Sequence, residues 1–154
     1  MKRTSPGVLA VLALLAAGAG YGFDHLLTVT GRATFTPSLF LPVLLVLLGA
    51  ACLGVAWPVR RSVRGGARID PFRAARASTL ARASSLLGAI MTGFGIGLLG
   101  FLSTRPVPTP VGSTVAMVAL IVGALVLIGA ALVAEQFCTL PKDPDDREPD
   151  DTAR

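Results

Sequence analysis

The sequence has little charge: only 15% of its 154 residues are Asp, Glu, Lys or Arg, whereas 53% are hydrophobic and the mean hydropathy is +0.69. The charged residues lie in short segments separated by long uncharged runs. A water-soluble domain needs charged residues spread over its outer faces. The composition therefore excludes a soluble globule and indicates runs that have lipid as their solvent.

Cysteine is also scarce. Cys52 lies within an apolar run and Cys138 lies just after another, a spacing that suits neither a disulfide framework nor a metal site. The sequence also has no Gly-rich phosphate loop and no pair of intramembrane carboxylates. We therefore predict no cofactor, no metal and no catalytic residue.

Four apolar windows, uncharged except for Asp24 near the end of the first, approach the roughly 20 residues that a helix needs to cross a bilayer. We predict an all-α membrane protein with four transmembrane helices in one domain over 1–140. An acidic, proline-spaced tail over 141–154 is predicted to be disordered. The predicted spans cover residues of about 7–27, 39–57, 83–102 and 111–134.

The first window has a second interpretation as a signal peptide, because a basic start precedes it and it contains Ala17, Gly18 and Ala19 as a small-residue cleavage pattern. Its apolar stretch is longer than the centre of a typical signal peptide, which favours a retained helix. Cleavage would leave three spans and would not change the side of the later segments.

Basic residues are distributed unequally between the connecting segments. The connector over 58–82, predicted as a loop, contains seven arginines: Arg60, Arg61, Arg64, Arg68, Arg73, Arg76 and Arg82. The N-terminal segment and the tail add five bases, whereas the other two connectors have only Arg32 and Arg105. The positive-inside rule therefore places both termini and the 58–82 connector in the cytoplasm.

The third helix is predicted to begin before the membrane. Asp70 followed by Pro71 is typical of an N-cap with proline at the first helical position, and nothing breaks the helix before Phe101. A continuous helix of this length would be about 48 Å long, so its first turns would extend into the cytoplasm.

Small residues four apart predict close helix contacts in lipid. The third helix has an unbroken series of them at 77, 81, 85, 89, 93 and 97, in which Gly93 and Gly97 are the expected closest contact. Gly18 and Gly22 offer a matching surface on the first helix. Either the third helix mediates homo-oligomerisation or these surfaces pack within one four-helix bundle, and we favour the second.

The possible functional acids are Asp24 and Glu135. Asp24 and His25 at the outer end of the first helix could be a proton-linked site for transport or an interfacial pair in contact with water. We favour contact with water, because neither residue reaches the bilayer centre. Glu135 and Cys138 lie one turn apart on the other side, without a histidine, so we expect Glu135 to pair with a nearby arginine.

The seven arginines are not interleaved with aromatic residues apart from Phe72, which argues against nucleic acid as a partner. Contact with anionic lipid headgroups explains them more simply. The predicted partners are therefore membrane lipids, with a second copy of the chain or another membrane protein as a possible further partner.

Three phrases resemble an uncharacterised actinobacterial membrane family, known as domain of unknown function 3180. They are Ala56-Trp57-Pro58-Val59-Arg60, Asp70-Pro71-Phe72-Arg73-Ala74-Ala75-Arg76, and Ala134-Glu135-Gln136-Phe137-Cys138 with Leu140-Pro141. The resemblance implies a multi-pass protein of the bacterial inner membrane without an established activity, and it assigns no catalytic residue. Arg82 stands where the family pattern leads us to expect lysine.

The leading hypothesis is a non-enzymatic membrane protein that acts as an assembly or interaction module with a basic cytoplasmic surface. The alternative is a subunit of a small oligomeric transporter or channel that uses Asp24 as its charged group. An enzyme centred on Glu135, Cys138 and the arginines is a third possibility.

Overall fold

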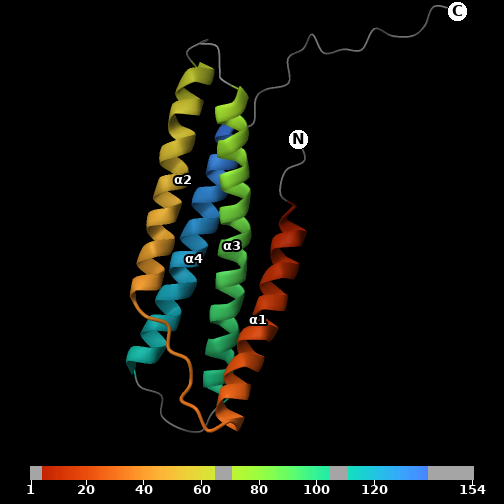
Figure 1. Ribbon diagram of the computed structural model, residues 1–154, viewed down its shortest axis with the longest axis vertical. Coiled ribbons are helices and arrows are strands. Elements are labelled where there is room, and N and C mark those ends of the chain that lie inside the picture. Colours follow the sequence, from red (N-terminus) through yellow and green to blue (C-terminus); the bar gives the residue numbers. More distant parts are fainter. Residues whose placement is uncertain (1–4, 65–70, 105–110, 139–154) are drawn as a thin grey trace, which may run out of the picture.

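The computed structural model describes residues 5–64, 71–104 and 111–138, and all the regular structure in these ranges is α-helical. The helices are α1 (Pro6–Val29), α2 (Phe40–Arg64), α3 (Pro71–Ser103) and α4 (Val111–Cys138), as Figure 1 shows. Each is long and apolar enough to cross a membrane. The prediction of an all-α protein with four candidate membrane helices is confirmed.

Helices are the structure expected for such runs, because a helix satisfies its backbone hydrogen bonds internally where lipid offers no partner. Successive helices run in opposite directions, so α2 ends and α3 begins at the same end of the structure (Figure 1). The start of α1 and the end of α4 lie toward this end too. We call it the arginine end, after Arg60, Arg61, Arg76 and Arg82.

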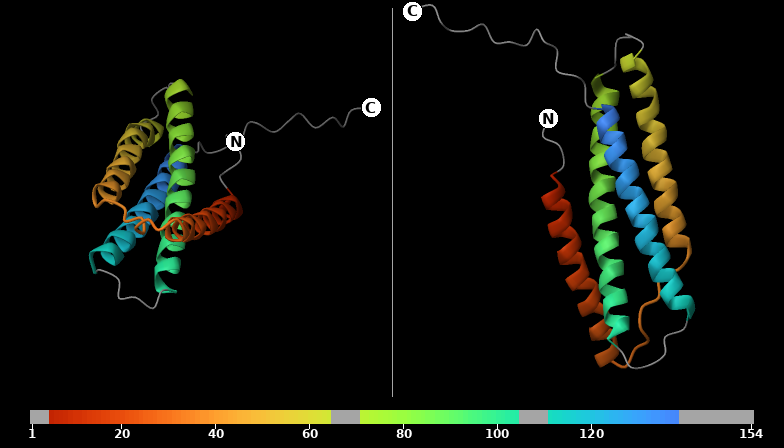
Figure 2. Two further views of the ribbon diagram at one scale, coloured as in Figure 1. Left: turned by 60° about the horizontal axis from the view of Figure 1, so that its bottom comes forward. Right: turned by 180° about the vertical axis from the view of Figure 1, so that it is seen from behind.

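The central element is α3, which packs against each of the other three helices. Helix α4 also packs against α2, whereas α1 contacts α3 alone. Figure 2 shows α1 on the side of α3 that faces away from α2 and α4. The fold is therefore a three-helix core with α1 attached to one side, rather than a closed four-helix bundle.

Small side chains let α3 approach its neighbours closely. All six members of the predicted series, residues 77, 81, 85, 89, 93 and 97, are buried. A step of four residues turns the helix by about 40°, so the series winds around α3. Ala81 packs against Cys52 and Ala56 of α2, whereas a Cβ at Gly93 or Gly97 would overlap the backbone of α1.

Other glycines lie where α4 contacts α3 and α2. A Cβ at Gly88 would meet Ile128 at 2.6 Å, and one at Gly95 would meet Ile121 at 2.8 Å. A Cβ at Gly123 of α4 would meet the backbone oxygen of Pro42 in α2 at 3.0 Å. The helix contacts of this protein thus depend on residues without side chains.

Two sequence predictions about the helix ends have different outcomes. Helix α3 begins at Pro71, as the sequence predicted, although Asp70 lies outside the described residues. The apolar span of α2, Phe40–Pro58, agrees with the predicted span of about 39–57, but the helix itself continues to Arg64, so the first part of the 58–82 connector is helical and is not a loop. A proline inside a helix removes one hydrogen bond, and in the turn that follows Pro58 the Arg60 guanidinium contacts Phe137 of α4.

Leucine at Gly97 should separate α1 from α3, because the new side chain would occupy the space of the Ala17 backbone. We expect Gly97→Leu to destabilise the protein by about 1–3 kcal/mol in detergent unfolding. Gly100→Leu is the matched control, since a Cβ there has no neighbour within 4 Å. Equal unfolding midpoints for the two variants would contradict the α1–α3 contact.

Candidate functional site

The candidate site is built around Asp24, which has no solvent-exposed surface. Its Oδ1 accepts a hydrogen bond of 2.9 Å from the backbone N–H of Phe35, eleven residues further along the chain. Its Oδ2 is buried and has no hydrogen-bond partner in the part of the chain that the structure describes. A carboxyl group thus lies inside the protein with one of its two oxygens unpartnered among the described residues.

The end of α1 explains how the chain reaches Asp24. Gly31 has a φ of 72°, in the left-handed region that glycine adopts without strain. The N–H of Gly31 donates to Thr28 O at 3.0 Å, and the N–H of Arg32 donates to Leu27 O at 2.9 Å. This pair of bonds is a Schellman motif, which ends the helix and turns the following segment back toward it.

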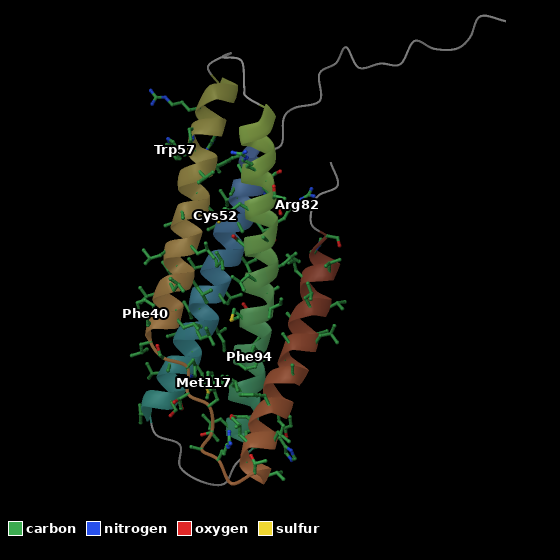
Figure 3. All side chains as sticks on the ribbon, viewed as in Figure 1. Phe40, Cys52, Trp57, Arg82, Phe94 and Met117 are labelled. Carbon is green, nitrogen blue, oxygen red and sulfur yellow. The ribbon has the colours of Figure 1, made fainter. Side chains whose placement is uncertain are left out.

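Aromatic side chains fix the returning segment. The Phe35 ring packs against Phe23 of α1 and Phe94 of α3, with centroid distances of 6.0 and 6.5 Å. Pro37 is buried in the same segment. Figure 3 shows Phe94 on the half of α3 away from the arginine end. Segment 30–39 therefore covers Asp24, and the predicted contact of Asp24 with water is wrong.

His25, the other member of the predicted interfacial pair, is exposed. Its ring lies edge-on to Phe101 at a centroid distance of 6.1 Å. Adjacent positions on a helix point in directions about 100° apart, so α1 turns Asp24 inward and His25 outward. The structure therefore does not bring these two residues together as one site.

The predicted packing glycines divide into two groups. Gly93 and Gly97 lie against Ala13 and Ala17 of α1, whereas a Cβ at Gly18 or Gly22 would have no neighbour within 4 Å. The glycine of α1 that faces α3 is Gly20, whose Cβ would meet the Phe94 carbonyl oxygen at 2.6 Å. Sequence reasoning missed Gly20, although it lies four residues before Asp24 and hence on the same face.

The arginine end forms a second candidate site. The Arg60 guanidinium lies over the ring of Phe137 in α4, 4.2 Å from its centroid. Arg61 and Arg76 are exposed, and Arg82 is half-buried (Figure 3). The side chains of Arg64 and Arg73, and the whole of Arg68, lie outside the described part of the chain.

The remaining chemically active side chains are Cys52 and Glu135. The Cys52 thiol lies 3.1 Å from the Ser84 hydroxyl in a buried contact between α2 and α3. Glu135 is half-buried, and Cys138 ends α4 with its side chain outside the described part. Within 5–64, 71–104 and 111–138, no group of three His, Cys, Asp or Glu side chains could hold a metal ion.

Removal of the Asp24 carboxyl should release segment 30–39 without unfolding the helices. We expect Asp24→Ala to accelerate hydrogen exchange of the Phe35 amide by up to about tenfold, because a hydrogen bond contributes about 0.5–1.5 kcal/mol. Asp24→Asn should retain part of the protection through its amide oxygen.

The control in the same protein is the Thr30 amide, which donates to the Leu26 backbone and does not depend on Asp24. Unchanged Phe35 exchange in Asp24→Ala would show that the carboxylate does not hold this segment.

Comparison with known proteins agrees with the resemblance in the sequence. A family profile described as a protein of unknown function, DUF3180, matches residues 9–142, which include α1 from Leu9 onward and all of α2, α3 and α4. No curated protein and no solved structure matches the chain. Asp24, the packing glycines and all seven arginines fall within the match. The chain therefore belongs to the DUF3180 family of proteins of unknown function.

Proposed function

We propose that this protein is a non-enzymatic membrane subunit that assembles through the face of α1 turned away from α3, with a second copy of the chain as its partner. The observation that carries the proposal is the open space beside Gly18 and Gly22. Every helix except α1 packs against at least two others. Assembly would give α1 its second neighbour.

Helix geometry puts these two glycines opposite the α3 contact. Two residues turn an α-helix by about 200°, so Gly18 and Gly22 point away from Gly20, which lies between them in sequence. Gly20 faces the Phe94 backbone of α3. The two faces of α1 thus have the same small-residue character, and α3 covers one of them.

Large apolar side chains border the open glycine face. Val11, Leu15, Leu26 and Val29 are between 56% and 71% exposed. Contact with lipid explains the exposure of these side chains. It does not explain two glycines four residues apart, because this spacing favours close helix approach in membranes. Because the same motif can pair with itself across a twofold axis, a homodimer is the simplest assembly.

The orientation follows from the charges. The arginine end and both chain termini face the cytoplasm across a bacterial plasma membrane, since bases accumulate on the cytoplasmic side of multi-pass proteins. Helix α3 has 33 residues, about 50 Å, so its first turns extend beyond the hydrocarbon core. Because α2 continues to Arg64, the basic cytoplasmic surface is formed by the ends of two helices, α2 and α3.

Transport is the second candidate function, and the burial of Asp24 favours it. An acid inside a membrane protein with an unpaired oxygen resembles the proton or ion sites of transporters. The acid lies beneath segment 30–39, however, so an ion could reach it only when that segment opens. Proton flux in liposomes that Asp24→Asn abolishes would establish transport as the function.

Leucine at both Gly18 and Gly22 should prevent assembly, because the new side chains would hold the two α1 helices apart. We expect the double variant to dissociate at least tenfold more readily, about 1.4 kcal/mol, by energy transfer between labelled chains in liposomes. Its detergent unfolding midpoint should stay at the wild-type value, since neither Cβ meets another part of the chain.

The matched control is Gly54→Leu on α2, another position with no neighbour within 4 Å of its Cβ. Energy transfer that falls in Gly54→Leu, or persists in the double variant, would contradict assembly through α1. Transfer only to a different co-purified membrane protein would replace the homodimer with a hetero-assembly.

A further inference from the structure

Three arginines of the arginine end lie at one level along the helices. The contact between Cys52 and Ser84 fixes the register of α2 against the antiparallel α3. Arg60 is eight residues beyond Cys52, and Arg76 is eight residues before Ser84, so both lie about 12 Å further toward the arginine end. Arg61 adjoins Arg60. We call Arg60, Arg61 and Arg76 the arginine belt.

This level coincides with the boundary of the hydrocarbon core. The apolar part of α2, Phe40–Pro58, has 19 residues and is therefore about 28 Å long, close to the thickness of the core. Trp57, the only tryptophan of the chain, is 64% exposed just inside this boundary. Tryptophan is enriched at the level of the headgroups, so the belt lies in the phosphate layer.

Trp57 and Arg61 share the outward face of α2. They are four residues apart and both are exposed, whereas Cys52 and Ala56 are buried against α3 and α4. In the part of the chain that the structure describes, no carboxylate pairs with Arg61 or Arg76. Both guanidinium groups belong to exposed residues.

Arg60 is held in place by α4. Its guanidinium carbon lies 4.2 Å from the centroid of the Phe137 ring, a cation–π contact that involves no hydrogen-bond acceptor. Stacking also limits the motion of this long side chain before a ligand arrives, so less entropy is lost on binding. The belt therefore combines one ordered guanidinium with two exposed ones.

We propose that the arginine belt binds the phosphate groups of anionic phospholipids, with Arg61 above Trp57 as the central contact. Guanidinium groups match phosphate oxygens with paired N–H donors. The acyl chains would lie along the apolar face of α2 below Trp57, where Val43 and Val46 are exposed on the same side of the helix as Trp57. A phospholipid would contact both the arginines and this apolar surface, whereas free phosphate would contact only the arginines.

Trp57 is a native probe for the test, because quenching of its fluorescence by brominated lipid reports which lipid lies beside it. The full-length protein is reconstituted in phosphatidylcholine containing either brominated phosphatidylglycerol or brominated phosphatidylcholine. We expect phosphatidylglycerol to quench Trp57 with about fivefold higher relative affinity, the contribution expected of one base at a membrane surface. Higher ionic strength should reduce the preference.

Arg61→Gln should remove most of this preference, and Arg76→Gln should remove less of it at Trp57 because it lies on α3. Arg32→Gln is the control, since Arg32 is exposed at the opposite end. Equal affinities of the two lipids in the wild-type protein, or a preference unchanged in Arg61→Gln, would overturn the proposal. So would an equal loss in Arg32→Gln, or abolition by inorganic phosphate at constant ionic strength.

Discussion

Close backbone contact along α3 holds the other helices in place, because hydrocarbon solvates apolar side chains as well as a protein interior does. Helices in lipid therefore associate through van der Waals contact and hydrogen bonds at short range. The buried small residues wind around α3, so that Ala81 contacts α2 while Gly93 and Gly97 contact α1. Helix α3 can thus contact three neighbouring helices on different sides.

The need for close helix contact also bears on residues outside the three-helix core. Gly18 and Gly22 repeat on the outer face of α1 the chemistry that its inner face uses against α3. Asp24 is buried because α1 packs closely and segment 30–39 returns over it. At the other end, α2 continues to Arg64 and α3 begins at Pro71, so both helices carry arginines at the arginine end.

The number of helices could be predicted from the sequence, because the length of an uncharged run directly measures its ability to cross a bilayer. The burial of Asp24 could not, since it depends on Phe35 returning from eleven residues away. The two glycine faces of α1 were also indistinguishable, because spacing identifies a face but not its neighbour. The continuation of helix α2 to Arg64 could not be predicted from hydropathy, because the helix extends beyond its apolar span and contains Pro58.

Helix α1 packs on α3 of its own chain, and cross-linking in the membrane tests this contact most directly. The Tyr21 and Phe101 rings lie 5.3 Å apart, so cysteines at these two positions should be joined by a short bifunctional thiol reagent. Cys52 and Cys138 would first be replaced by alanine. We expect a cross-link within one chain, without a change in molecular mass. Products of twice the mass alone, or no product, would contradict it.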